Sequence, residues 1–312
     1  MHENREKIAI IGNGFDLSHG LKTSYSHFNK FVSELDPKLV AHVNEIFYNQ
    51  GYPKEDIEYW SDLEVMLSSL SELDYDEHYE DAFNGAETDM DRASYWHDPE
   101  YNASQKAKNE LLVPLKLKNY FDRCINSINL RNVSRKPCLE MNGYDLFINF
   151  NYTETLQDVY CIQNARIFHV HGDANSSYIL GHNDIEKPPY PDPYETYIDP
   201  DTGETTSDAD IRQAQVRESL NDTYTTLFRS YFKNSKKIIA DNQQWFKQFN
   251  NATHVTFMGL SMGLHDEIYV TEINKLLPKD AQIVVYYHEN KEKMVSKCES
   301  LLPCRIIKYI EW

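Results

Sequence analysis

The chain has 312 residues, enough for one large domain or two of ordinary size, and 41% of them are hydrophobic, which excludes a disordered chain. Its formal net charge is −18, from 49 acidic residues against 31 Lys and Arg, and this opposes non-specific binding to nucleic acid and to anionic membranes. The cysteines are scattered without CxxC spacing, and no apolar window is long enough to span a bilayer, so we expect a reduced, cytoplasmic protein outside the membrane.

An apolar run near the N-terminus leads directly into a turn bracketed by glycines. Residues 8–11 are short, mostly β-branched and without alternation, which is typical of a strand buried on both faces of a parallel sheet. Gly12 and Gly14 follow, and glycine allows positive φ or close approach of a ligand. Such a turn can direct N–H groups at phosphate oxygens. Gly12-Asn13-Gly14 is only half of a dinucleotide-binding fingerprint, so a tight turn without a ligand fits it as well.

Helical spacing then dominates residues 27–135, which we interpret as a helical insertion. One helix in it is predicted to run from Ile57 to Leu70, with Glu64 on the same face as Trp60. The acidic segment 74–100 is predicted to be a solvated loop or irregular helices, and segment 187–206 an irregular loop or lid. We therefore predict a single α/β domain over residues 1–312 that carries these excursions.

Further strands and helices are predicted after this insertion. A buried strand over residues 146–151 stops at Asn151, with Thr153 placed to cap the next helix. The other strands are predicted at 167–172, 178–184, 254–261, 282–287 and 305–310, and helices at 117–128, 208–249, 265–277 and 290–300. Their alternation towards the C-terminus is typical of βαβ units, so the predicted fold is a Rossmann-like, mostly parallel sheet flanked by helices.

Polar side chains stand at the carboxyl ends of the predicted strands. They are Asn13, Asp16, Asn149, Asn151, His169, His171, Ser261 (which follows Gly259) and Asn290. Ligands of open parallel sheets bind beyond the carboxyl ends of the strands, so this convergence predicts a ligand site. Each residue also has a structural interpretation, because Asp16, Asn151 and Ser261 each stand where a helix begins.

Five motifs, in order, resemble the bacteriophage abortive-infection AbiH family. They are GNGFDLSHGLKTSY at 12–25, WSDLE at 60–64, NFNYTE at 149–154, HVHG at 169–172 and GLSMGLHD at 259–266. This resemblance spans most of the chain and implies an anti-phage protein. More distantly, the same landmarks resemble the sirtuin-like NAD-binding fold, including its NAD glycohydrolases.

The sirtuin-like resemblance implies that NAD is the substrate and that its nicotinamide N-glycosidic bond is hydrolysed. It implies that Asn151 holds the nicotinamide ribose or the attacking water and that His171 is the base. The implied NAD contacts come from Gly12, Asn13, Gly14, Asp16, Asn149, Gly259, Ser261 and Asn290. Thr153 stands where the sirtuin-like motif usually has Asp, which weakens the expected ordering of the Asn151 loop, and the lack of CxxC pairs argues against protein deacylation.

Two other functions stay open at this stage. His169 and His171 point the same way on a strand, and with His182 and Asp184 they form a candidate metal site for a metal-dependent hydrolase, whereas the NAD interpretation needs no metal. The second alternative is a non-catalytic module for nucleotide sensing or phage recognition. We expect NAD or a related nucleotide as ligand and a phage protein or a partner defence protein as trigger, and no residue pattern decides whether the protein is a homo-oligomer.

Overall fold

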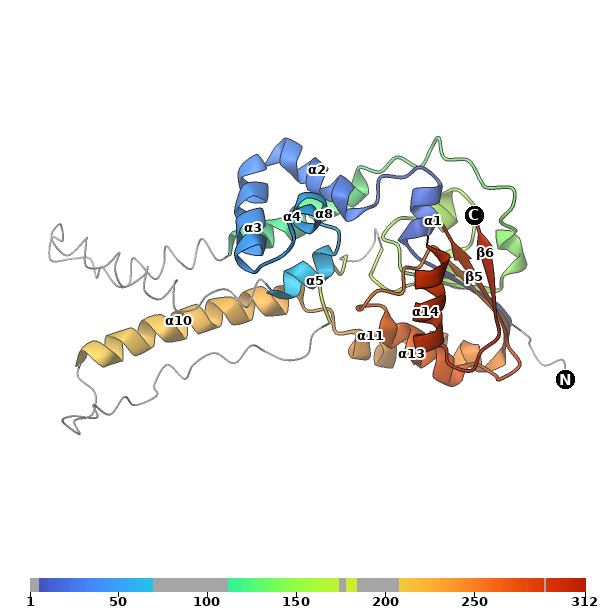
Figure 1. Cartoon of the computed structure of the whole chain (residues 1–312). Coiled ribbons are helices and arrows are strands. Elements are labelled where there is room, and N and C mark those ends of the chain that lie inside the picture. Colours follow the sequence, from blue (N-terminus) through green and yellow to red (C-terminus); the bar gives the residue numbers. More distant parts are fainter. Residues whose placement is uncertain (1–5, 70–111, 174–177, 184–207, 289) are drawn as a thin grey trace. The chain divides into compact units, whose positions relative to one another are not determined.

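The structure is a computed structural model of the chain, and it describes residues 6–69, 112–173, 178–183, 208–288 and 290–312 (Figure 1). The chain divides into two compact units. Unit 1 comprises Met1–Phe31, Tyr120–Asn183 and Lys233–Trp312, and unit 2 comprises Val32–Asn119 and Asp184–Phe232. The predicted helical insertion overlaps the first segment of unit 2. The segments 74–100 and 187–206, predicted to be irregular, lie outside the described residues.

Unit 1 is built on a six-stranded sheet in which all paired strands are parallel. The strands are β1 (Glu6–Ile11), β2 (Leu146–Asn149), β3 (Ile167–His169), β4 (Ala252–Met258), β5 (Gln282–Tyr287) and β6 (Ile307–Glu311). Their order across the sheet is β3-β2-β1-β4-β5-β6. This is the order of dinucleotide-binding doubly wound sheets, in which the winding reverses between β1 and β4. The prediction of an α/β fold with a mostly parallel sheet is confirmed.

Both faces of this sheet are covered by helices. Ile8 and Ile10 of β1 pack in one core cluster with side chains of α11 (Ser235–Asp241), α12 (Gln243–Phe246), α13 (Glu267–Leu276) and α14 (Lys291–Leu301). Ala9 and Ile11 pack in a second cluster with α1 (Asn13–Ser18), η3 (Met141–Gly143) and α9 (Thr155–Asp158). Short 3₁₀ turns, η4 (Asn164–Arg166) and η5 (Lys247–Asn251), lead into β3 and β4. Because successive side chains point to opposite faces and both faces are buried, β1 is apolar without alternation.

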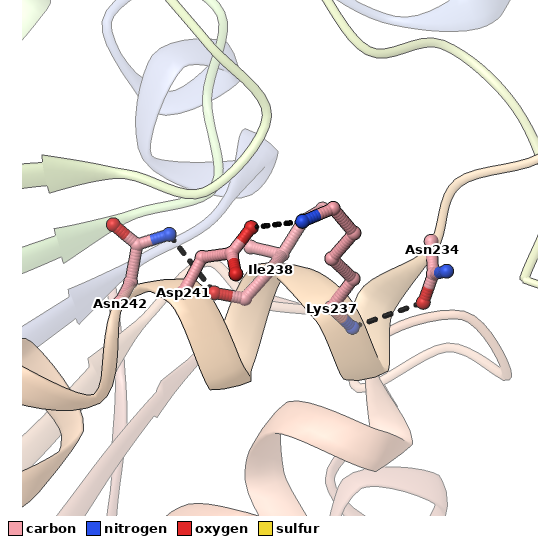
Figure 2. A network of polar contacts seen from close by, with 5 residues as sticks. All are labelled: Asn234, Lys237, Ile238, Asp241 and Asn242. Carbon is pink, nitrogen blue, oxygen red and sulfur yellow. Dashed lines mark hydrogen bonds and ion pairs between the residues drawn. The ribbon is translucent and has the colours of Figure 1, made fainter.

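Helix α11 begins at a side-chain cap (Figure 2). Asn234 Oδ1 accepts the backbone N–H of Lys237 at 2.9 Å, and Lys237 Nζ is paired with the Asp241 carboxylate at 2.6 Å. At the other end, Asn242 Nδ2 donates to the carbonyl of Ile238 at 2.9 Å. The N-cap bond satisfies an N–H that the helix itself leaves without a partner. It thereby fixes the chain directly after residue 233.

The described part of unit 2 is helical. It contains α3 (Pro37–Asn49), α4 (Lys54–Tyr59), α5 (Leu63–Ser68), η2 (Val113–Leu115) and α10 (Asp208–Tyr231), while α2 (Tyr25–Leu35) and α8 (Lys116–Asn126) each span a boundary between the units. The prediction of one continuous helix from Ile57 is wrong. Trp60 takes a left-handed conformation, with φ 48°, and separates α4 from α5. Its buried indole Nε1 donates to Asn44 Oδ1 at 2.8 Å, which holds the break in place.

The predicted strand at 178–184 is also wrong for the residues that can be described. Residues 178–183 contain a single isolated bridge position and no strand. The N–H of Ile179 donates to the carbonyl of His171 at 2.9 Å, so this segment stays close to the chain that leaves β3. In the described ranges, none of the helices has the length and apolar character that crossing a bilayer requires.

Candidate functional site

Two glycine turns meet at the point where the winding of the sheet reverses. The N–H of Gly12 donates to the carbonyl of Met258 at 2.9 Å, and the N–H of Gly14 donates to the carbonyl of Gly259 at 2.8 Å. Gly259 has φ +70°, and a Cβ placed on it would lie 2.1 Å from the backbone nitrogen of Phe15. The glycines therefore allow the two backbones to touch. Because the N–H groups of Gly12 and Gly14 are bonded within the protein, a phosphate over this turn would need other donors.

Asp16 lies in the first helix directly beyond this turn, and its side chain has no exposed surface. Thr153 Oγ1 donates to Asp16 Oδ2 at 2.5 Å, and Thr153 Oγ1 lies 3.0 Å from Thr155 Oγ1. Burial raises the pKa of Asp16 to about 6, and the neighbouring Thr153, Thr155 and Asn151 side chains oppose that rise in part. The site thus holds a carboxyl group that changes charge near neutral pH.

Asn151 stands in the loop between β2 and α9, and it is 4% exposed. Its N–H donates to Asn149 Oδ1 at 3.1 Å. Thr153 does not cap α9, whose N-cap is Glu154 without a side-chain bond, and its hydroxyl instead joins this loop to Asp16. The weak ordering expected of a loop with Thr at position 153 is therefore offset by a buried bond to the first helix.

Two buried acceptor atoms of this group have no partner among the described residues. They are Asp16 Oδ1 and Asn151 Oδ1. Buried polar atoms in folded proteins nearly always have a hydrogen-bond partner, because burying one without a partner costs about 1–3 kcal/mol. Two such acceptors on adjoining elements at the carboxyl edge of the sheet are suited to a ligand that presents O–H or N–H donors.

His171 follows β3 and is enclosed by the residues that flank Asn151. Its ring lies edge-on to Phe150, with centroids 5.6 Å apart, and 5.5 Å from the ring of Tyr152. Lys233 Nζ lies 3.4 Å from His171 Nε2. Burial lowers the pKa of His171 well below its ordinary value, and the charge of Lys233 lowers it further. The structure therefore brings His171 and the Asn151 loop together and keeps the imidazole neutral at physiological pH.

The second imidazole of the HxH pair has other neighbours. His169 Nε2 lies 2.8 Å from Gln157 Nε2, and Nδ1 lies 3.4 Å from Asn149 Nδ2, whereas His171 faces Lys233. Burial lowers the pKa of His169, and the charge of Asp173 opposes this in part. In the part of the chain that can be described, no group of three or more His, Cys, Asp or Glu could hold a metal ion. The candidate ligand Asp184 lies outside that part.

The remaining predicted residues lie at the same edge of the sheet, at or before the start of the next helix, and their side chains are exposed. Asn13 is exposed on the glycine turn. Ser261 is exposed after β4, and its carbonyl accepts a hydrogen bond from Lys297 Nζ at 2.8 Å. Asn290 follows β5 in a left-handed conformation and caps α14, since its Oδ1 accepts the N–H of Lys293 at 3.0 Å. The cap accounts for Asn290 without a ligand.

A pocket of about 690 Å³ adjoins the Asn151 loop within unit 1. The loop contributes Tyr152, Thr153 and Glu154 to its wall, and the other polar residues that line it are Asn126, Ser127, Asn129, Arg131, Asp158 and Tyr178. Burial raises the pKa of Glu154, and the charges of Asp158 and Asp173 raise it further. Small-molecule sites typically measure about 300–1,000 Å³, so this pocket has the volume of one.

Sequence reasoning missed Lys233 and the partners of the predicted residues. Lys233 is completely buried next to His171. It lies between α10 and α11 and belongs to no motif, so nothing in the sequence marks it as a site residue. Gln157 and Thr155 carry the contacts of His169 and Thr153. The polar side chains of residues 149–157 indicate in the sequence that this loop is a candidate functional segment. They do not indicate which side chains contact one another.

Comparison with known proteins adds one finding. The family model described as "Bacteriophage abortive infection AbiH" matches residues 8–287, which include the glycine turns, the Asn151 loop and His171 but not Asn290. No curated protein and no solved structure matches the chain.

Proposed function

Because the chain belongs to the bacteriophage abortive-infection AbiH family, we propose that it acts in anti-phage defence by binding NAD and hydrolysing its nicotinamide N-glycosidic bond. The observation that carries the NAD proposal is the pair of buried acceptors without partners, Asp16 Oδ1 and Asn151 Oδ1. They adjoin the point where the sheet reverses its winding, which is where sheets of this strand order bind dinucleotides.

Ribose is the part of NAD that fits these two atoms. Each buried acceptor needs a donor, and the adjacent 2′- and 3′-hydroxyls of a ribose supply two O–H donors with a short spacing. A carboxylate and an amide oxygen can each take one of them. Asp16 and Asn151 would then hold the sugar, and the nearby pocket of about 690 Å³ offers volume for the groups attached to it.

The chemistry asked of the protein is modest. The oxygen of a water molecule bonds to C1′ of the ribose, the C–N bond breaks, and its electron pair leaves with nicotinamide, which departs neutral and needs no general acid. Asn151 would orient the ribose or the water. His171 is neutral, as a base must be, and general-base assistance is typically worth about a hundred- to ten-thousand-fold. The water proton would end on Nε2 of the imidazole as Lys233 Nζ withdraws from that nitrogen, and orientation must supply the rest of the acceleration.

One observation favours a second function, nucleotide sensing without turnover. His171 is buried, and its Nε2 already faces Lys233 at 3.4 Å. In this arrangement the imidazole supports the Asn151 loop and does not present a free nitrogen to water. A module of this kind would bind NAD or ADP-ribose at the same acceptors and leave the N-glycosidic bond intact.

Incubation of the purified protein with NAD, followed by chromatography for nicotinamide and ADP-ribose, separates the two functions. The enzyme proposal expects NAD loss that Asn151→Ala and His171→Ala abolish. Matched controls are Asn250→Ala and His254→Ala, which lie just before and near the start of β4 at the opposite edge of the sheet and should leave turnover unchanged. NAD binding without turnover would support the sensing module. Turnover undiminished in both site variants would remove the roles proposed for Asn151 and His171.

A further inference from the structure

Lys233 is a completely buried lysine that contacts a histidine of the candidate site. Its ammonium group lies 3.4 Å from His171 Nε2, and burial of a lysine is rare unless its charge is compensated. The backbone around it is fixed on both sides. Its N–H donates to the carbonyl of His182 at 2.5 Å, and its carbonyl accepts the N–H of Ser235 at 2.8 Å, where α11 begins at the Asn234 cap (Figure 2).

An ammonium can only donate hydrogen bonds, so the nitrogen that faces it must accept. His171 Nε2 is therefore the acceptor, and the proton of the neutral ring lies on Nδ1. The backbone of Phe150 partly opposes the lowered pKa of the same ring, as a carbonyl that faces Nδ1–H does, and the Phe150 side chain lies edge-on to it at 5.6 Å. The contacts thus run from Lys233 through His171 to the residue that directly precedes Asn151.

We propose that Lys233 is a positioning residue of this site, which fixes His171 as the neutral, Nδ1-protonated tautomer and through it holds the loop that carries Asn151. The ring packs between Phe150 and Tyr152, the two neighbours of Asn151, so a rotated ring would displace both. An effect of Lys233 on NAD turnover rests on the proposed function, whereas its effect on the tautomer of His171 does not.

The other groups around His171 are compatible with this role. The ring of Tyr269 lies 6.4 Å away, and the charge on a protonated His265 would lower the pKa of His171 in the same direction as Lys233. His265 Nδ1 lies 2.7 Å from Asn183 Oδ1 and is oriented by that amide. Among the described residues, the charged group that contributes most to the pKa of His171 is Lys233.

Nitrogen NMR of the full-length protein with ¹⁵N-labelled histidine tests the tautomer directly, with His171→Gln used to assign the signal. We expect wild-type His171 to be Nδ1-protonated and neutral throughout the pH range in which the protein is folded. In Lys233→Met the pKa of His171 should rise by about one unit or more, because a like charge has been removed. Lys233→Arg keeps the charge and should keep the wild-type signal, as should Lys236→Met, which removes an exposed lysine of α11.

Several outcomes overturn the proposal. An Nε2-protonated wild-type ring, or a wild-type ring that titrates near its ordinary pKa, refutes it without any variant. An unchanged His171 signal in folded Lys233→Met refutes it as well. If Lys233→Met does not fold, the wild-type tautomer and its retention in Lys233→Arg decide the question.

Turnover provides a separate readout. If the protein hydrolyses NAD, Lys233→Met should lower kcat by about tenfold or more with a smaller change in KM, since misplaced groups lose orientation. Lys233→Arg should restore at least part of this loss. A wild-type protein that leaves NAD intact contradicts the proposed enzyme function, while the NMR result still stands or falls alone.

Discussion

At the scale of single residues, Asp16 is the most informative group in unit 1. It is fully buried, and the groups that interact with it are two hydroxyls and an amide. These neutral groups stabilise a carboxylate less than a cationic side chain would. Burial raises the pKa of Asp16 to about 6 for this reason. A carboxyl kept in such an environment costs stability when it ionises, and that cost can be measured.

The first prediction concerns the pH dependence of folding. Folded Asp16 keeps its proton up to about pH 6, whereas the unfolded residue releases it near the ordinary aspartate pKa of 3.8. The folded state therefore binds more protons between these values, and stability falls as pH rises. Below the lower value there is no penalty, and above pH 6 it reaches roughly 3 kcal/mol. Urea unfolding from about pH 4 to pH 7 should show wild type losing roughly that much stability relative to Asp16→Asn.

Asp280→Asn is the control for this titration. It removes an exposed carboxylate from the turn between α13 and β5 and should follow the wild-type pH profile. If wild type and Asp16→Asn differ by a constant amount over the whole range, Asp16 does not experience the buried environment described here.

The second prediction concerns the hydroxyl of Thr153. Thr153→Val keeps the shape of the side chain but removes the donor to Asp16 Oδ2, so at pH 7 it should lower the free energy of unfolding by about 2 kcal/mol, as expected for a hydrogen bond to a charged group. Thr153→Ser keeps the donor and should lose much less. Chemical denaturation of the two variants measures the difference, and equal losses would show that packing, not the hydroxyl, matters.

Thr153 also shows why sequence alone could not assign these residues. A hydroxyl just before a helix is a good N-cap, and the sequence predicted that role. In the folded chain the hydroxyl reaches Asp16, 137 positions away in the sequence. Lys233 is a similar case, because nothing near it in the sequence marks it as buried next to His171. The type of residue at each strand end was predictable, but its partner depends on which strands are neighbours.

At the scale of elements, the glycine turns that follow β1 and β4 determine how closely the two backbones can approach each other at the centre of the sheet. A Cβ on Gly12 would lie 2.5 Å from Leu260 Cα, and one on Gly14 would lie 2.8 Å from Gly259 Cα. Both distances are shorter than carbon atoms that are not bonded can approach. These turns therefore require glycine on both sides, even though only Gly259 among these three has positive φ.

The third prediction separates this close approach from backbone strain. Gly259→Ala adds a Cβ 2.1 Å from Phe15 N, at φ +70°, and should lower the free energy of unfolding by about 3 kcal/mol or more. Gly20→Ala has nearly the same φ, +76°, with no atom within 4 Å of the added Cβ, and should cost only about 1–2 kcal/mol. Urea unfolding of both variants gives the difference, which measures the steric contact. Equal losses would mean that the turns separate easily.

The elements themselves were predictable where local pattern decides them. The strand predicted at 282–287 coincides with β5, and the helices predicted near it are α13 and α14, because burial on both faces gives an uninterrupted apolar run between amphipathic helices. The break at Trp60 was not predictable in this way. Ile57, Trp60, Leu63 and Leu67 are all buried, so their spacing is the same for one helix as for two.

At the scale of the whole molecule, a net charge of −18 bears on the proposed ligand. ADP-ribose is an anion because of its two phosphates, and a strongly acidic protein repels it at long range. Around the Asn151 loop the described titratable groups include Glu154, Asp158 and Asp173, which add to this repulsion. Arg131 is a cation in the wall of the same pocket, but the acidic groups outnumber it, so we expect short-range hydrogen bonds to the ribose to dominate recognition and the repulsion to weaken when salt screens it.

The fourth prediction is that salt strengthens binding of ADP-ribose, the product expected of the proposed reaction. Isothermal titration from about 20 mM to about 150 mM salt, where the screening length falls to roughly 8 Å, should lower Kd by a few-fold. Adenosine carries no phosphate, so its affinity should not change with salt and it serves as the control. A basic phosphate pocket would give the opposite trend, because its attraction is what salt screens. Weaker ADP-ribose binding at higher salt would therefore show that cations, and not the Asp16 and Asn151 acceptors, dominate recognition.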